Sequence, residues 1–278
     1  MLPIGKFLEE HFSVEGDVAV VTGGTGVLGS AMAGALAQAG AKVAIVSRRR
    51  DVAAHTIAQL EASGGQVMAI HADVLDPASL QKAQQILTDS WGAPRILVNA
   101  AGGNVAGATI SEAQTPFDVP LEAFREVVDL NFTGTWLSCQ AFGPALVATG
   151  GGSIVNVSSM AAGRPLTRVG AYGAAKAAVE SMTRWLAIEL PRRFGAAVRV
   201  NAIAPGFFIA EQNRSLLMTG IGNPTERGQR IIDHTPAGRF GQPNELISTL
   251  LWLCSHGASF VNGTVVPVDG GFSAFSGV

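Results

Sequence analysis

The sequence predicts an α/β fold in which seven parallel strands form one doubly wound sheet with helices on both faces. Two observations predict it. Short apolar runs recur along the chain without apolar–polar alternation, which is typical of parallel strands that are covered on both sides. Stretches with the punctuation of helices lie between these runs, and such an alternation indicates a parallel sheet. The expected strands are residues 18–21, 42–46, 66–70, 96–99, 153–157, 198–203 and 264–268.

Glycine and proline mark the ends of the expected helices. Gly40 stands where a helix ends before the second strand, and the glycine run 150–152 ends another before the fifth. Asp76 supplies an N-cap after the third strand, with Pro77 at the first helical position. No linker, repeat or change of composition marks a second domain, so residues 1–278 are expected to form one.

The connection over residues 207–240 is longer than the others and follows the end of the sixth expected strand. It mixes aromatic and polar residues. Long connections in compact domains are often functional lids or disordered segments. We expect a lid over a substrate pocket here.

The composition excludes several classes of protein. Of the 278 residues 47% are hydrophobic and 14% are charged, which favours a large core and excludes disorder. The net charge of −2 leaves no basic surplus for nucleic acid. No run of 18 apolar residues and no secretory signal is present, so we expect a cytoplasmic protein without membrane contact. Cys139 and Cys254 stand alone, and neither a disulfide nor a metal site is expected.

A glycine-rich turn joins the first strand to an apolar helix. Gly24, Gly26 and Gly29 have the G-x-G-x-x-G spacing. Glycines let a pyrophosphate approach the backbone, and the helix N-terminus offers unpaired N–H groups. The position of the turn favours a Rossmann-type dinucleotide site over a merely tight connection.

The end of the second strand bears on which dinucleotide binds. Ser47 is followed by Arg48, Arg49 and Arg50. An NAD site usually has a carboxylate here for the ribose 2′-hydroxyl, whereas an arginine suits a 2′-phosphate. We therefore expect NADP(H) as the preferred cofactor, and NAD(H) if the arginines form only a solvated loop.

Tyr172 and Lys176 are four residues apart in an expected helix, so they share one face. A neighbouring ammonium group lowers the pKa of a phenol, which makes it usable as a general acid–base. Ser159 follows the fifth strand, where its hydroxyl can hold a substrate oxygen beside the phenol.

The glycine turn, Ser159, Tyr172 and Lys176 together resemble the short-chain dehydrogenase/reductase family over nearly the whole chain. The resemblance implies a catalytic tetrad with Asn131 as fourth member, holding a proton-relay water. It also implies cofactor contacts from the turn and from the loops after four strands: Gly23, Gly24, Thr25, Gly26, Val27, Leu28, Ser47, Arg48, Asp73, Val74, Asn99, Ala100, Ala101, Gly102, Pro205, Gly206 and Ile209, with Tyr172 and Lys176.

The roles implied by this resemblance are specific. Lys176 would bind the nicotinamide ribose and lower the pKa of Tyr172, which would exchange a proton with the substrate oxygen while hydride moves. Two positions depart from the family pattern. Val27 stands where glycine is common, which puts its phosphate contact in doubt, and Ala210 stands where threonine commonly holds the carboxamide.

Within the family, residues 204–208, 211–214, 225–232, 234–241 and 269–278 resemble the bacterial D-mannonate oxidoreductases (fructuronate reductases). A sugar acid needs a cation for its carboxylate and polar partners for its hydroxyls. The side chains expected to supply them are Asn104, Arg164, Arg168, Gln212, Asn213 and Arg214. His234 is expected to be structural.

Three other functions stay open. A gluconate-type dehydrogenase or a 3-oxoacyl reductase would use the same chemistry on a different substrate. A non-catalytic cofactor-binding regulator is disfavoured because such proteins usually lose the tyrosine or the lysine, and this chain has both.

The expected helices over residues 124–147 and 172–190 are apolar on more than one face, so they must be buried in the core or against another subunit. The family resemblance implies assembly through these helices, as a homotetramer or homodimer.

Overall fold

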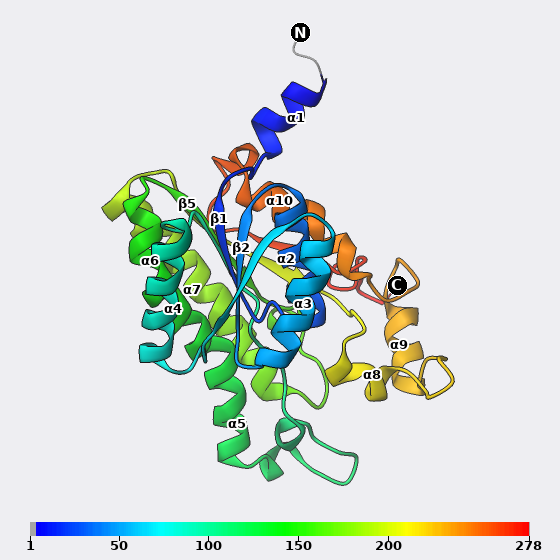
Figure 1. Ribbon diagram of the computed structural model, residues 1–278. Coiled ribbons are helices and arrows are strands. Elements are labelled where there is room, and N and C mark those ends of the chain that lie inside the picture. Colours follow the sequence, from blue (N-terminus) through cyan, green and yellow to red (C-terminus); the bar gives the residue numbers. More distant parts are fainter. Residues whose placement is uncertain (1–3, 278) are drawn as a thin grey trace.

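One parallel sheet of seven strands forms the centre of the molecule, in the order β3-β2-β1-β4-β5-β6-β7 (Figure 1). The structure, a computed structural model, describes residues 4–277, apart from the side chains of residues 211 and 212. The strands are β1 (Val18–Thr22), β2 (Lys42–Ser47), β3 (Gln66–His71), β4 (Ile96–Asn99), β5 (Gly152–Val157), β6 (Val198–Pro205) and β7 (Val265–Val268). Each lies within two residues of its expected bounds, and the predicted fold is confirmed.

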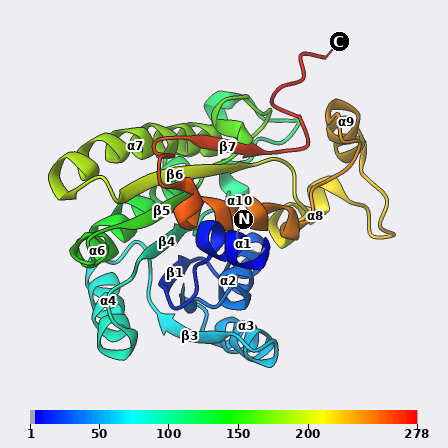
Figure 2. The same cartoon turned by 90° about the horizontal axis from the view of Figure 1, so that it is seen from above.

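Helices cover both faces of the sheet, as the view from above shows (Figure 2). One face carries α2 (Val27–Gln38), α3 (Arg50–Ala62) and α10 (Ile247–Cys254), and the other carries α4 (Pro77–Trp91), α6 (Gly134–Ala148) and α7 (Gly170–Phe194). Successive side chains of a strand point to opposite faces. Val21 therefore packs with Met32 of α2, whereas Val20 packs with Phe142 of α6. Because both faces are covered, the strands show no polar alternation.

The strand order reverses between β1 and β4. From β1 the chain proceeds outward through β2 to β3, and from β4 it proceeds through β5 and β6 to β7 in the opposite direction. A crevice forms at the carboxyl ends of strands at such a switch point, where open α/β sheets bind their ligands. Thr22 and Asn99 are paired in register at this place.

The helix expected over residues 124–147 is interrupted. α5 (Leu121–Val128) runs into one π-helical turn, Asp129–Thr133, before α6 begins. Such turns occur mostly as single bulges within α-helices and often at functional sites. The sequence does not reveal the interruption, because no glycine or proline stands within residues 129–133.

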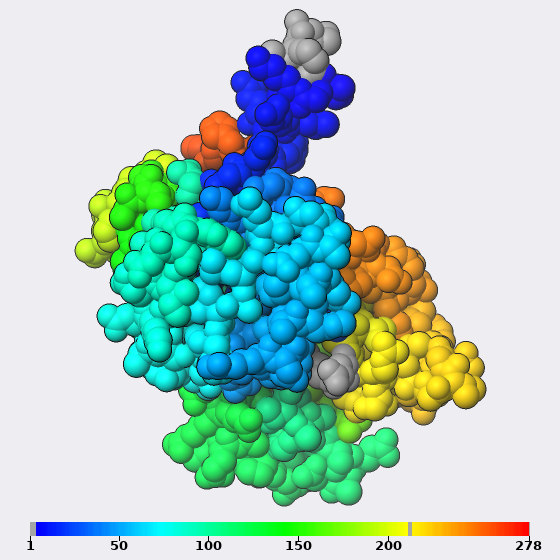
Figure 3. All heavy atoms as spheres, in the orientation of Figure 1, coloured from blue at the N-terminus to red at the C-terminus, as the bar shows by residue number. Residues whose placement is uncertain are grey.

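The long connection after β6 has secondary structure of its own. It contains α8 (Glu211–Leu217) and α9 (Glu226–His234), which lie together beside the sheet (Figure 1). At the other end of the molecule α1 (Ile4–Phe12) projects from the body (Figure 3). Within residues 4–277, no helix combines the length and the apolar character needed to cross a membrane.

The helices expected to be apolar all round have an exposed face. Trp185 is 51% exposed and Ile188 is 56% exposed, both on α7. Trp185 lies against Trp136 of α6, with ring centroids 6.1 Å apart. Burial within one chain therefore does not account for the apolar character of these helices.

Candidate active site

The glycine turn after β1 packs tightly against the end of β4. Gly23 has a φ of +67°, and a Cβ there would lie 2.6 Å from the Cα of Ala101. A Cβ on Gly29 would collide with the carbonyl oxygen of Gly23. Only glycine fits at both positions. The turn thus requires Gly23 and Gly29 for its own packing.

The first turn of α2 is suited to hold an anion. Its N-cap, Gly26, has no side chain to bond the amide groups at the start of the helix. Those amides and the positive end of the helix dipole favour negative charge. Val27 is the first helical residue and is 39% exposed, so the position that departs from the family pattern still opens outward. This end of the helix fits a dinucleotide's pyrophosphate.

The residues expected to recognise the adenosine end lie together. Arg48 Nη1 is 3.7 Å from Asp73 Oδ2, and both side chains are more than a third exposed. Ser47 is buried and its hydroxyl lies 3.2 Å from that of Thr25, which links β2 to the glycine turn. Val74 is buried against Gly134 of α6. Arg48 is therefore accessible to a ligand, whereas Ser47 packs β2 against the glycine turn.

The loop after β4 connects directly to the π-helical turn. Asn131 is fully buried, and its Nδ2 donates to the carbonyl oxygens of Gly103 at 2.7 Å and Val127 at 2.8 Å. Its Oδ1 accepts from the backbone N–H of Gly103 at 3.0 Å. The side chain of Asn131 thus fixes the loop, while Asn99 bonds Asn156 at 2.9 Å beneath it.

A narrow space stays open above Asn131. Gly102 is exposed, and a Cβ there would lie 2.6 Å from Asn131 Oδ1 and 3.1 Å from Lys176 Nζ. The missing side chain leaves room beside these two polar atoms at the carboxyl end of β4. A nicotinamide ribose fits such a cradle.

Ser159, Tyr172 and Lys176 come together, as the sequence predicts. Ser159 follows β5 and caps a short helical turn, with its Oγ accepting from the N–H of Ala161 at 3.2 Å. Tyr172 lies close enough for the Ser159 hydroxyl to influence its pKa. Lys176 Nζ lies 5.7 Å from the centroid of the Tyr172 ring. These side chains form one cluster above the end of β5.

The electrostatics of the cluster differ from the expectation. Burial raises the pKa of Tyr172, and the hydrogen bond from Ser159 lowers it by a smaller amount. Burial also lowers the pKa of Lys176 to about 8. The expected lowering of the tyrosine pKa by Lys176 is therefore not the dominant effect within the chain itself.

The loop after β6 lies against the chain that follows β7. A Cβ on Gly206 would lie 2.6 Å from the Cα of Asp269, so a side chain would separate the two segments. Pro205 is the last residue of β6, and Ile209 follows two phenylalanines in the loop. This loop begins at the same sheet edge as the Ser159 and Asn99 segments.

Comparison with known proteins agrees with this geometry. The family model described as enoyl-(acyl carrier protein) reductase matches residues 25–273. The chain is 44% identical to the uncharacterized oxidoreductase UxuB of Bacillus subtilis over 96% of this chain and 99% of that one. The chain belongs to the short-chain dehydrogenase/reductase family. As a member it is an NAD(P)-dependent oxidoreductase that acts on CH–OH or carbonyl groups.

Two solved structures of this family are similar along almost their whole length. One is described as a "putative D-Mannonate oxidoreductase" from Haemophilus influenza with bound NAD; it is 37% identical, with a TM-score of 0.90 over 98% of this chain and 100% of that one. The other is a gluconate 5-dehydrogenase from Burkholderia cenocepacia in complex with NADP and tartrate, 29% identical, with a TM-score of 0.83 over 95% and 98%.

A cavity of about 730 Å³ in this dehydrogenase lies between four separate segments. They are the loop at Glu112, the loop that leads into α7, the chain from Phe207 through α8 and α9, and the C-terminal segment at Phe272. Its lining includes Thr167, Arg168, Arg227, Arg230 and His234. Arg168 precedes Tyr172 by four residues. Ser159, Tyr172 and Lys176 are not among its lining residues.

The six residues expected to contact the substrate lie in different surroundings. Arg168 lines the cavity, while Asn104 Nδ2 bonds Thr109 at 2.6 Å. Arg164 donates from Nε to the carbonyl oxygen of Ser273 at 2.7 Å and so anchors the C-terminal segment. The side chain of Asn213 hydrogen-bonds the backbone of the loop after β6. Arg214 is exposed and does not line the cavity. The side chain of Gln212 is not among the side chains that the structure describes.

Arg227 and His234 line the cavity but were not predicted as site residues. Arg227 stands in the first turn of α9 and donates to the hydroxyl of Thr167 at 3.0 Å. His234 packs its ring against Phe272, with centroids 4.7 Å apart. Their position depends on how α9 packs against the loop before α7, and no local pattern in the sequence signals it.

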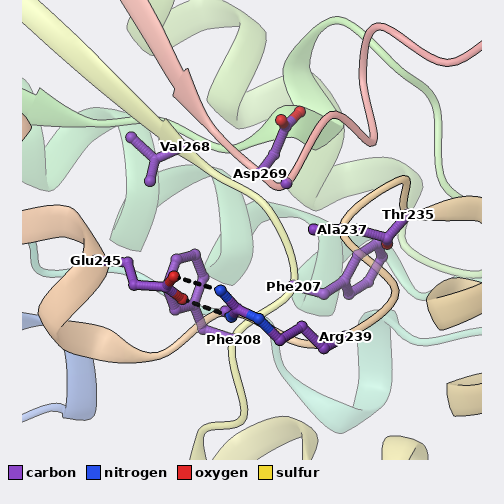
Figure 4. Close-up of a pocket in the computed structure, with 10 residues that line it drawn as sticks. Phe207, Phe208, Thr235, Ala237, Arg239, Glu245, Val268 and Asp269 are labelled. Atoms are coloured by element: carbon purple, nitrogen blue, oxygen red, sulfur yellow. Dashed lines mark hydrogen bonds and ion pairs between the residues drawn. The ribbon is translucent and has the colours of Figure 1, made fainter.

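A second, smaller cavity of about 80 Å³ lies at the base of the same segment (Figure 4). Arg239 and Glu245 form a two-pronged ion pair beside it, at 2.8 and 2.6 Å. That pair lowers the pKa of Glu245 to about 2. The ring of Phe208 lies over Gly241, where a Cβ would be 2.6 Å away. These contacts hold residues 207–208 against residues 239–245. Within residues 4–277, no group of three or more metal-ligating side chains is found.

Proposed function

We propose that this enzyme interconverts a secondary alcohol and a ketone on a sugar acid of the D-mannonate/D-fructuronate type. One observation carries the proposal: the larger cavity, on the loop that leads to Tyr172, is lined by the three arginines Arg168, Arg227 and Arg230. A pocket for a neutral, apolar substrate would not gather arginines. The similarity to a structure described as a D-mannonate oxidoreductase supports the same substrate class.

The proposed chemistry at the site assigns one task to each residue. Bound NAD(P) supplies or accepts the hydride. Tyr172 exchanges a proton with the substrate oxygen, and Ser159 holds that oxygen through its hydroxyl. Lys176 binds the ribose from its buried position, while Asn131 keeps the loop after β4 in place and supports the proton relay.

The proposed cofactor contacts follow the edge of the sheet from β2 to β6. The amides at residues 23–28 bind the pyrophosphate, Asp73 and Val74 border the adenine, and residues 99–102 with Pro205, Gly206 and Ile209 border the nicotinamide. Arg48 makes NADP(H) the preferred cofactor, because its guanidinium suits a 2′-phosphate. Position 47, where an NAD site usually has a carboxylate, is a serine.

The decisive experiment compares matched substrates. D-mannonate and D-mannitol differ in the carboxylate, so their kcat/KM values with NADP⁺ and NAD⁺ report whether the enzyme requires an acid. We expect a preference of at least about tenfold for D-mannonate, the value of one charge-assisted hydrogen bond. Equal turnover of the acid and the alditol would contradict the proposed substrate class.

A gluconate-type dehydrogenase is the second candidate. The similarity to a gluconate 5-dehydrogenase favours it, and both candidates share a carboxylated polyol. Identification of the oxidised carbon by NMR of the product distinguishes them. Turnover of 3-oxoacyl thioesters in preference to either acid would instead support a 3-oxoacyl reductase.

Residues 207–240 are proposed to form the substrate lid, since α8 and α9 border the larger cavity. Assembly as a homotetramer or homodimer is proposed through α6 and α7, because Trp185 and Ile188 are more than half exposed. Sedimentation of the wild type and of a Trp185→Glu variant tests the assembly; a change toward the monomer is expected.

A further inference from the structure

We infer that Arg168 and Arg227 together form the site that binds the substrate's carboxylate. This inference rests on the proposed function and assigns the charge recognition to one pair of side chains. The two arginines come from segments about sixty residues apart and line the same cavity. The sequence alone does not place Arg227 in the site. In this inference it supplies the second guanidinium beside that of Arg168.

Arg227 is held rigidly with its guanidinium at the cavity. Nη1 donates to the hydroxyl of Thr167 at 3.0 Å, and Nη2 donates to the carbonyl oxygen of the same residue at 3.4 Å. A guanidinium has five N–H groups, so these two bonds leave others for a ligand. The bonds also attach α9 to the loop that leads to Tyr172.

Arg168 is held with comparable precision. Its Nε donates to the carbonyl oxygen of Ile110 at 2.6 Å, and its own carbonyl oxygen accepts from the N–H of Ile110 at 3.0 Å. Among the described residues other than glycine, Arg168 alone has a positive φ, at 76°. Such a conformation is costly for a long side chain and often accompanies a functional site.

Arg168 and Arg227 bring two positive charges to the cavity, and no carboxylate among the described residues forms an ion pair with either. Burial lowers the pKa of Arg227, and the positive charge of Arg168 lowers it further. Arg227 also stands at the positive end of the α9 dipole. Of the carboxylates in the lining, Glu226 pairs with Arg230 and Glu112 is exposed. A bound carboxylate would relieve this repulsion.

The surroundings of the pair suit the rest of a sugar acid. His234 and Thr167 line the same cavity and offer polar atoms to hydroxyl groups. Phe207 lines it from the loop after β6, which begins beside the nicotinamide position. A sugar acid whose carboxylate is bound by the arginines would therefore meet polar partners for its hydroxyl groups in the same cavity.

The test uses the complete enzyme with two readouts. The first is the ratio of kcat/KM for D-mannonate to that for D-mannitol. The second is calorimetric binding of tartrate, a small hydroxylated dicarboxylate, in the presence of NADP⁺. Arg227→Gln and Arg168→Asn are expected to lower the ratio and to weaken tartrate binding by about 10–100-fold each. Asn is chosen at position 168 because it tolerates a positive φ.

Three further variants separate binding from folding. Arg230→Gln removes a cavity arginine that is already paired, and we expect less than about a threefold change in either readout. Thr167→Val removes one of the two hydrogen bonds that position Arg227 but leaves both arginines, so it should weaken tartrate binding less than Arg227→Gln does. Arg227→Lys keeps the charge without the planar fork and should lie between wild type and Arg227→Gln. Melting temperature and NADPH fluorescence confirm that each variant is folded.

The outcomes distinguish the inference from the proposed function. If the wild type prefers D-mannonate but Arg227→Gln and Arg168→Asn keep that preference and bind tartrate normally, the arginine pair is wrong and the proposed function stands. If the wild type shows no preference for the acid, the proposed substrate class fails, and tartrate binding then decides the inference. Absence of tartrate binding by the wild type, or an equal loss in Thr167→Val, would overturn it.

Discussion

Lys176 donates a hydrogen bond of 2.8 Å from its Nζ to the carbonyl oxygen of Val157, the last residue of β5. Lys176 is only 3% exposed, and no carboxylate of the described residues pairs with it. Burial therefore lowers its pKa to about 8. The carbonyl at the end of a strand thus fixes a buried ammonium group next to the candidate catalytic tyrosine.

This buried lysine should make the stability of the protein depend on pH. The folded-state pKa of about 8 lies below the ordinary value of 10.5. Between these values the unfolded chain binds a proton that the folded chain does not, so the free energy of unfolding rises with pH. From pH 8 to pH 10 the rise attributable to Lys176 is about 2 kcal/mol. Urea unfolding of the wild type and of Lys176→Met at both pH values measures the difference.

The control for this prediction is Lys82→Met, which removes an exposed lysine of α4. This variant should keep the pH dependence of the wild type. An equal slope in wild type and Lys176→Met would show that Lys176 does not titrate in this range.

Replacing Tyr172 by Phe should abolish most catalysis while leaving the cofactor bound. The phenol is the only group proposed to exchange a proton with the substrate, and loss of a general acid–base typically costs about 10²–10⁴-fold in rate. Steady-state kcat with D-mannonate and fluorescence titration with NADPH measure the two effects. Retention of more than a tenth of the rate would contradict the assignment.

The two neighbouring serines provide a matched pair. The hydroxyl of Ser159 influences the pKa of Tyr172, whereas the hydroxyl of Ser158 donates to Glu180 at 3.0 Å. Ser159→Ala is expected to lower kcat by about tenfold or more, and Ser158→Ala by less than about threefold. Equal losses would indicate a general disturbance of the β5 end.

Gly102→Ala should impair the enzyme through crowding. Its Cβ would lie 2.6 Å from Asn131 Oδ1 and 3.1 Å from Lys176 Nζ, in the space proposed for the nicotinamide ribose. We expect kcat/KM to fall by about tenfold or more, because small displacements of positioned groups are costly. Gly163→Ala is the control, since a Cβ there meets nothing within 4 Å. Normal NADPH affinity in Gly102→Ala would place the ribose elsewhere.

Arg48→Gln tests the cofactor preference. Arg48 lies at the surface beside Asp73, and its guanidinium is proposed to bind the 2′-phosphate. The Kd for NADPH should rise about tenfold or more, while that for NADH changes much less. Arg50→Gln, in the first turn of α3, serves as the control. Preferential binding of NADH by the wild type would show that the arginine run is a solvated loop.

The sequence alone determined the fold and most of the candidate catalytic cluster. The apolar runs reveal the strands because both faces of a parallel sheet are buried, so each strand carries its signal locally. The glycine turn is equally local: Gly23 and Gly29 are required by contacts within a few residues and with the adjacent strand. Tyr172 and Lys176 share a face because helix geometry places them there.

Only the tertiary structure decided which polar residues surround the substrate cavity. Arg168 meets Arg227 because α9 folds back over the loop before α7, and nothing in either segment encodes that meeting. Asn213 and Arg164 were expected at the substrate, yet they bond the backbone of nearby segments. The pKa of Tyr172 also depends on tertiary packing. Burial by the surrounding chain raises it, whereas the local sequence predicts that Lys176 lowers it. Periodicity records burial along one element, whereas long-range contacts depend on the packing of the whole chain.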